Sequence, residues 1–233
     1  MLRMMFGEPP REPEGRLGET LQIIRRFVSL LQERSAAGSG QEMRYRKYEI
    51  YTLGLLASLD ELEESQYASH KFAAQLTTRR LSAMSEDDLL SYYRHVYFDK
   101  NAFIRVFSLL DKLGTLMNDM LQLRTERIKP HFSYFTVLRN MRERNLHPAL
   151  SKTLNELKER YREPMSRLRK RRNTEIHYMN SELQDDLRRL QGIAGQDAEL
   201  ENIQEQLNDL DQGCEMVVES LYHTFRYAYG QLR

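Results

Sequence analysis

The C-terminal part of the chain carries a long heptad pattern of apolar residues. Its positions follow alternating steps of three and four residues, with Thr224 at the remaining seam position: Leu200, Ile203, Leu207, Leu210, Cys214, Val217, Leu221 and Ala228. Such steps keep side chains on one stripe of an α-helix, so the pattern predicts a long helix with a continuous packing seam. A strand would alternate with a period of two, and the chain has no such alternation of useful length.

The rest of the chain from Leu17 onward also has helical periodicity and helix-end signals. We expect helices over residues 17–34, from a Ser39/Glu42 capping box, from a Ser85/Asp88 capping box over 89–98, over 99–123, from Pro130 to Arg144, from Pro148, and from Pro164 to about Leu190, ended by Gly192 and Gly195. The sequence therefore predicts an all-α fold, an up-and-down helical bundle with additional N-terminal helices and a long C-terminal helix.

The 233-residue length suits one substantial core. We expect a single all-α domain over residues 17–233, preceded by a disordered segment over residues 1–16 that is rich in Pro, Glu and Arg. The 35 basic and 34 acidic residues give a net charge of +1. Any attraction for an anionic partner must therefore be local.

The single cysteine, Cys214, excludes an intrachain disulfide and fits a reducing cytosol, so we expect a cytoplasmic protein. The longest apolar runs, around Leu53–Leu59, are too short for a membrane span, and the N-terminus lacks the apolar region of a signal peptide. No membrane association is expected. The histidines His70, His95, His131 and His223 lack the paired spacing of a metal site, so we expect no metal and no cofactor.

The most informative stretch for function is Arg172-Asn173-Thr174-Glu175-Ile176-His177. It brings a guanidinium, a carboxamide and an imidazole together in a helix-forming segment. Arginine binds phosphate through a planar pair of hydrogen bonds, and histidine is suited to proton transfer near neutral pH. The combination indicates phosphodiester chemistry.

Helical geometry places constraints on this stretch. Arg172 lies four residues after Leu168 and four before Ile176, so it occupies a position on the apolar stripe of its helix. Arg172 and His177 are five residues apart, which separates them by roughly 140° around the helix axis. We therefore expect them to converge only obliquely, or through the second copy in a two-fold dimer.

The hexapeptide resembles the signature of the HEPN superfamily, an all-α family whose motif is Arg, a polar residue that is often Asn, a short spacer and then His. Arg172, Asn173 and His177 match this motif one for one. The long apolar helix before the motif, with its Phe107–Gly114 stretch, and the closing helix after it are also similar to HEPN families. The resemblance covers about Met43 to Arg233. A second Arg-to-His pair of equal spacing, Arg142 and His147, lacks the Asn and runs into Pro148, so we interpret it as a helix end.

The resemblance implies a metal-independent endoribonuclease of toxin–antitoxin, stress or defence systems, in which the RNA 2′-hydroxyl attacks the adjacent phosphate. In that chemistry His177 is the general acid or base, Arg172 stabilises charge on the phosphate oxygens, and Asn173 orients the imidazole or binds a phosphate oxygen. The basic run and one aromatic residue are the candidate RNA-binding residues: Arg167, Arg169, Lys170, Arg171 and Tyr178.

A different interpretation stays open. A non-catalytic helical module for dimerisation or partner binding would retain the motif for structure, with Arg172 in a buried pair with Glu175 and His177 in a capping or packing role. For partners we expect a homodimer, with the motif helix or the heptad helix near the interface. We also consider RNA, a protein antitoxin, and a nucleotidyltransferase.

Overall fold

The computed structural model describes residues 2–38, 40–78, 80, 83–177 and 202–233. The elements over these residues are α1 (Leu2–Met5), α2 (Gly15–Ala36), α3 (Glu42–Ala73), α4 (Glu86–Met120), the 3-10 turn η2 (Thr125–Arg127), α5 (Tyr134–Glu143), α6 (Pro148–Arg160), α7 (Arg162–His177) and α9 (Ile203–Leu232). No β-strand occurs in the part of the chain that is described. The predicted all-α bundle is confirmed.

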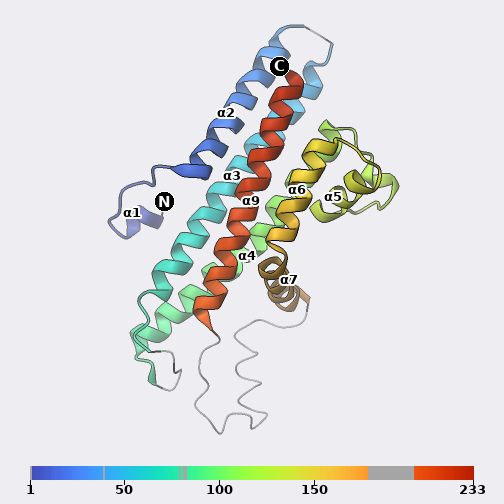
Figure 1. Ribbon diagram of the computed structural model, residues 1–233. Helices are drawn as coiled ribbons and strands as arrows, with labels where there is room; N and C mark the ends of the chain where they lie inside the picture. Colours follow the sequence, from blue (N-terminus) through green and yellow to red (C-terminus); the bar gives the residue numbers. More distant parts are fainter. Residues whose placement is uncertain (1, 39, 79, 81–82, 178–201) are drawn as a thin grey trace.

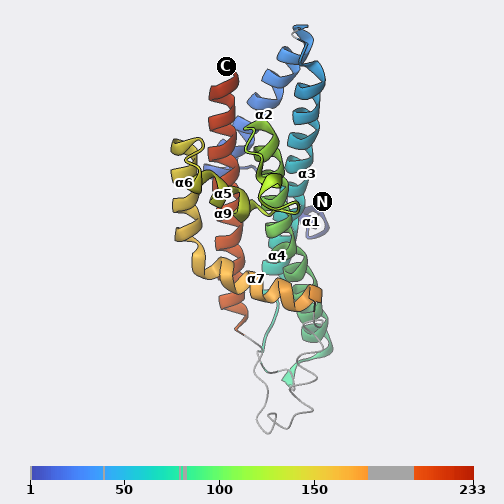
Figure 2. The same ribbon diagram turned by 90° about the vertical axis from the view of Figure 1, so that its right-hand side faces the viewer.

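Helices α2, α3, α4 and α9 run up and down along one long axis, and α9 lies between α2 and α6 (Figure 1). The short helix α7 runs across this axis, over the lower part of α9 and α4 (Figure 2). A single hydrophobic core extends from Leu17 in α2 to Ala228 in α9. None of the described helices is long and apolar enough to cross a membrane.

The heptad seam of α9 is used inside the chain. Its seam residues from Leu207 to Ala228 are buried, and α9 packs on α2, α3, α4, α6 and α7. Leu200, the first seam position, lies outside the described residues. Because five helices of the same chain surround α9, its seam is not available to a second copy. Other faces of α9 carry exposed residues such as Arg226 and Gly230, so a dimer with this helix near its interface stays a prediction.

Helix α4 is the apolar helix that the sequence indicated, and it is longer than expected. Two helices were expected over residues 89–98 and 99–123, and the structure joins them into one. Ser85 and Asp88 form the predicted capping box, with the Ser85 hydroxyl accepting the Asp88 N–H at 3.1 Å. Of the other expected capping box, Ser39 lies outside the described residues, and Glu42 accepts the Gly40 N–H at 2.8 Å. No break occurs at Asp99, because its carboxylate is buried against another helix rather than capping a new one.

Helix α5 begins at Tyr134 and not at Pro130 as expected. The carboxylate of Asp111 in α4 accepts the Tyr134 N–H at 2.9 Å, which supplies the acceptor that the first amide of a helix lacks. Gly114 in α4 allows this close approach, because a Cβ there would lie 2.9 Å from Tyr134 Cα. The Tyr134 hydroxyl donates to Ser220 Oγ at 3.0 Å, so the start of α5 is tied to both α4 and α9. Helix α6 begins at Pro148, as predicted.

Part of the segment expected to be disordered packs on α3. Residues 2–5 form α1, and the Phe6 ring lies edge-on to Tyr67 and Phe72 at centroid distances of 6.1 and 5.4 Å. The Lys71 ammonium donates to Glu8 at 2.5 Å. Phe6 gives this polar segment an apolar anchor that its overall composition does not reveal.

The close approach at Gly114 gives a test of the α4–α5 packing. We expect Gly114→Ala to lower the free energy of unfolding by about 1–3 kcal/mol, because the added methyl overlaps buried backbone. Gly54→Ala in α3 is the matched control, since nothing lies within 4 Å of a Cβ there. The control should be neutral or stabilising by up to about 1 kcal/mol. Chemical denaturation of both variants measures the difference, and equal stabilities would contradict the packing described.

Candidate functional site

Helix α7 carries the motif and is held by an apolar face of Pro164, Met165 and Leu168. Leu168 is fully buried, and its Cδ1 lies only 2.6 Å from where a Cβ at Gly213 of α9 would be. The glycine thus lets α7 pass close across α9. This contact fixes the height at which α7 crosses the bundle.

Two arginines of the basic run are bound to carboxylates of other helices. Arg167 donates from Nε and Nη2 to the two oxygens of Asp209 in α9, at 2.7 and 2.6 Å. Arg171, one turn further along, donates from Nη2 to Asp99 in α4 and lies over the Phe103 ring at 4.8 Å. The side chain of Asp209 is 3% exposed and that of Asp99 is 2% exposed. These two predicted RNA-binding residues therefore anchor α7 to the bundle.

Buried polar groups surround the Arg171–Asp99 ion pair. Asp99 Oδ1 and Arg171 Nη1 are both buried and have no hydrogen-bond partner among the residues that the structure describes. His95, one turn before Asp99, is 1% exposed and contacts the Ser69 carbonyl oxygen through Nδ1 at 3.0 Å. Burial lowers the pKa of His95, although Asp99 and the Ser69 carbonyl oppose the shift. Removing one partner of the ion pair in this region would leave a buried charge unpaired, which is strongly destabilising.

Arg172 lies on a different face of α7, and it forms no such interhelix ion pair with the described part of the chain. Its Nη2 and Nε donate to the side-chain oxygen of Asn173 at 2.7 and 3.2 Å. Its guanidinium lies 4.8 Å from the centroid of the Phe107 ring in α4. Arg172 and Asn173 are half-buried. The structure therefore brings Arg172 and Asn173 together, with the guanidinium resting on an aromatic ring and part of it reaching solvent.

A second guanidinium shares this ring. Arg169 lies 5.9 Å from the Phe107 centroid and 4.8 Å from that of Phe135 in α5. Asp111, one turn after Phe107, lies near both arginines. Burial raises the pKa of the Asp111 carboxyl, while the Tyr134 N–H, Arg172 and Arg169 act in the opposite direction. Arg169, Arg172, Asn173, Phe107 and Asp111 are called the arginine cluster below.

His177 is the last residue of α7 and is exposed. The described residues form no hydrogen bond or ion pair with its imidazole, and Ile176 beside it is 52% exposed. The structure does not bring His177 into contact with Arg172. Lys170 is exposed, and Tyr178 lies outside the described residues.

The non-catalytic interpretation expects a buried ion pair between Arg172 and Glu175. In the structure, Glu175 forms an ion pair with a different residue. The Glu175 carboxylate faces Lys100 of α4, with Nζ to Oε1 at 3.1 Å. Lys100 lies seven residues before Phe107, the residue that Arg172 contacts. A lysine from another helix is therefore a charged partner of Glu175 among the described residues.

Four residues of this region were missed from the sequence: Asp99, Phe107, Asp111 and Asp209. Asp99 lies three residues before Ala102 and seven before Val106, on the apolar stripe of α4. A carboxylate at such a position signals a buried partner, and this signal was present. The described residues contain no group of three or more His, Cys, Asp or Glu side chains placed to hold a metal ion.

The fold and the site together define an all-α bundle with an Arg–Asn–His motif on a short crossing helix. A family comparison agrees, because residues 51–229 match the model of the Cthe2314-like HEPN family. That match covers more than half of the chain, so the chain belongs to the HEPN superfamily. Searches of curated proteins and of solved structures gave no match.

Replacing an arginine that anchors α7 and replacing the motif arginine should have different effects on stability. We expect Arg171→Ala to lower the free energy of unfolding by about 3–5 kcal/mol, because it leaves the Asp99 carboxylate buried without its partner. Arg172→Ala should change it by less than about 1 kcal/mol, since that guanidinium is half-exposed and holds no other helix. Urea unfolding of both variants measures the contrast. The double variant Asp99→Ala/Arg171→Ala should recover part of the loss, and additive losses would contradict the pairing.

The His70–Asp211 contact predicts a pH-dependent contribution to stability. His70 Nε2 lies 2.7 Å from Asp211 Oδ1, and this hydrogen bond raises the pKa of His70 above its ordinary value, against burial. The protonated form is favoured in the folded state, so the contribution is complete below pH about 6.5 and is lost as pH rises through the folded-state pKa. The difference in unfolding free energy between native protein and His70→Gln should shrink as pH rises. We expect at most about 1 kcal/mol, because the pair is partly exposed.

Proposed function

We propose that this protein is a metal-independent endoribonuclease that cleaves RNA by attack of the 2′-hydroxyl on the adjacent phosphate. One observation carries the proposal. Within the described residues, the motif arginine forms no hydrogen bond or ion pair with a carboxylate of another helix, in contrast to Arg167 and Arg171. A guanidinium that rests on Phe107 and reaches solvent is preorganised to bind a phosphate.

The residues have distinct roles in this reaction. The 2′-hydroxyl loses its proton and bonds to phosphorus, the bond to the 5′-oxygen breaks, and the leaving oxygen gains a proton. His177 transfers one of these protons, because its imidazole is exposed and histidine is the usual general acid or base of such reactions. Arg172 neutralises the negative charge that develops on the phosphate oxygens. Asn173 holds the Arg172 guanidinium through its side-chain oxygen.

A complete site requires a second copy of the chain. Arg172 is directed towards Phe107 of α4, whereas His177 lies at the exposed end of α7, roughly 140° further around the helix. A two-fold dimer that joins the exposed ends of two α7 helices would bring His177 of one copy to Arg172 of the other. Ile176, 52% exposed beside His177, supplies apolar surface for that contact.

Only part of the basic run is available to bind RNA. Arg167 and Arg171 are engaged with Asp209 and Asp99. Arg169 and Lys170 remain exposed near Arg172 and are available to phosphates on either side of the cleaved bond.

The competing function is a non-catalytic helical module that binds a partner, such as an antitoxin or a nucleotidyltransferase. The hydrogen bonds from Arg172 to Asn173 favour it, because they occupy the motif arginine inside the chain. The two functions differ in one measurable respect, which is turnover of RNA.

Cleavage of a mixed RNA substrate in the presence of a chelator tests the proposal. We expect activity to persist without divalent metal and to fall by about 100-fold or more in His177→Ala and in Arg172→Ala, with folding retained. Lys152→Ala in α6 is the control, since Lys152 is an exposed lysine outside the site, and it should be fully active. Cleavage that needs added magnesium, or that persists in both variants, would refute the mechanism.

Mixing the two inactive variants tests the shared site. In a dimer of one Arg172→Ala chain and one His177→Ala chain, one of the two composite sites is intact, so mixing should restore roughly a quarter of native activity. Absence of rescue, or a monomer in sedimentation at micromolar concentration, would exclude a site that spans two copies.

A further inference from the structure

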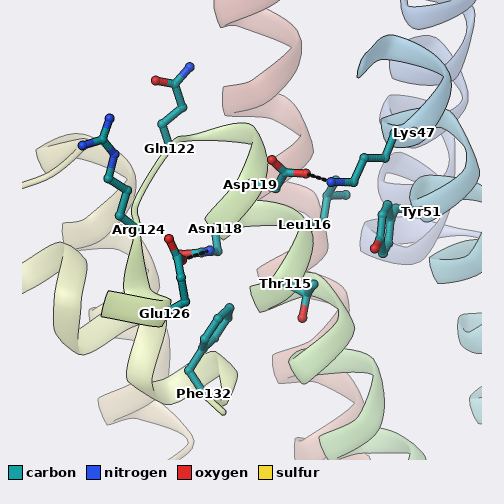
Figure 3. A pocket seen from close by; sticks show the side chains of 10 residues that line it. All are labelled: Lys47, Tyr51, Thr115, Leu116, Asn118, Asp119, Gln122, Arg124, Glu126 and Phe132. Carbon is teal, nitrogen blue, oxygen red and sulfur yellow. Dashed lines mark hydrogen bonds and ion pairs between the residues drawn. The ribbon is translucent and has the colours of Figure 1, made fainter. Parts of the chain in front are cut away.

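A groove of about 410 Å³ opens at the end of α4, away from the motif helix. It lies between Lys47 and Tyr51 of α3 on one side and the α4–α5 connection on the other, with Thr115 and Asp119 of α4 between them (Figure 3). Thr115 lies one turn beyond Asp111 on α4, and none of the residues that line the groove belongs to the arginine cluster. The groove is therefore a separate site.

The connection that forms one wall has an unusual backbone. Gln122 and Arg124 adopt left-handed conformations, with φ of 52° and 56°, which residues with a Cβ disfavour. Both side chains are exposed and line the groove. The residues that alternate with them, Leu123 and Thr125, are buried. The left-handed conformations thus direct Leu123 and Thr125 into the core and Gln122 and Arg124 to the groove.

Buried side chains hold the connection in this shape. Asn140 of α5 donates from Nδ2 to the Leu123 carbonyl at 3.0 Å and to Thr125 Oγ1 at 2.9 Å. Asn118 accepts the Thr125 N–H at 2.8 Å. The Leu123 N–H also donates to the Asn118 carbonyl at 3.0 Å, which closes the end of α4. These contacts hold the backbone that carries the Gln122 and Arg124 side chains.

The groove offers a ligand a guanidinium, an amide and an aromatic ring. The Asp119 carboxylate accepts from Lys47 at 2.5 Å, and Glu126 accepts from Asn118 at 2.8 Å, so the acidic groups are engaged. Within the described residues, the side chains of Gln122 and Arg124 form no hydrogen bond or ion pair. Tyr51 is 42% exposed, and the Lys47 ammonium lies 5.9 Å from the centroid of its ring.

We propose that this groove binds a nucleotide, with the base stacked on Tyr51 and the phosphate bound by Arg124. Stacking on tyrosine is favourable for any base, and a guanidinium binds phosphate through two hydrogen bonds. The Gln122 amide, which both donates and accepts, is placed to contact a polar edge of the ligand. The volume suits a ligand of this size. The nucleotide is either free or an unpaired position in RNA, and the site does not depend on the cleavage reaction.

Binding of full-length protein to 5′-AMP and to a short labelled oligoadenylate, measured by calorimetry and fluorescence anisotropy, tests the proposal. We expect Tyr51→Ala and Arg124→Ala each to weaken binding about tenfold or more. Arg124→Gly, which keeps the left-handed backbone, should weaken it equally if the guanidinium is the cause. Tyr93→Ala and Arg127→Ala are controls, because Tyr93 is an exposed aromatic elsewhere on α4 and Arg127 does not line the groove.

The two probes separate the sources of the ligand. Saturable binding of 5′-AMP identifies a free nucleotide as sufficient, whereas binding of the oligonucleotide alone identifies a base in a chain. Tyr51 and Arg124 lie outside the proposed nuclease site, so a loss of binding in their variants assigns the binding to the groove. Lys152→Ala, an exposed lysine outside both sites, should leave binding of both probes unchanged. No binding of either probe at millimolar concentration, or binding that Tyr51→Ala and Arg124→Ala do not affect, would overturn the proposal.

Discussion

The ion pair between Arg171 of α7 and the buried Asp99 of α4 sets the orientation of the motif helix. A helix that crosses a bundle on a small apolar face is free to rotate about its own axis unless polar contacts prevent it. Arg171 is held by Asp99, and Arg167, one turn earlier, is held by Asp209 of α9. Two ion pairs on one side of a helix, to two different helices, leave a single rotation possible. That rotation places Arg172 over Phe107 and leaves His177 exposed.

The basic run of α7 therefore combines two kinds of residue that are adjacent in sequence. Successive residues of an α-helix point about 100° apart, so neighbours in the run face different surroundings. Arg171 faces a buried carboxylate, and Arg172 faces an aromatic ring with access to solvent. The anchoring arginines satisfy charges that would otherwise be buried alone, while Arg169 and Arg172 keep donors available. Within the described residues Arg172 is tied to no carboxylate of another helix, which leaves its guanidinium for the phosphate in the proposed reaction.

The burial of α9 bears on how two copies of this chain would meet. A heptad seam of this length usually suggests a coiled coil between chains, but here α2, α3, α4, α6 and α7 of the same chain cover it. The free surface near the motif is instead the exposed end of α7, with Ile176 and His177. A dimer formed there would join the two halves of the motif, whereas a dimer through the buried seam of α9 would require the bundle to open. The proposed nuclease site and the proposed dimer interface therefore share one surface, the exposed end of α7.

The sequence by itself determined the class of fold, most helix positions and the location of the motif. These depend on local information: the spacing of apolar residues, the Ser85/Asp88 capping box, Pro148 at a helix start, and the Arg172–His177 stretch. Only the tertiary structure decided which arginines are structural, because Asp99 lies 72 residues before Arg171 and Asp209 lies 42 residues after Arg167. It likewise decided that Glu175 faces Lys100, that α5 begins at the carboxylate of Asp111, and that Gln122 and Arg124 face a groove. Periodicity fixes the direction in which a side chain leaves its helix, but the packing of distant helices determines what that side chain meets.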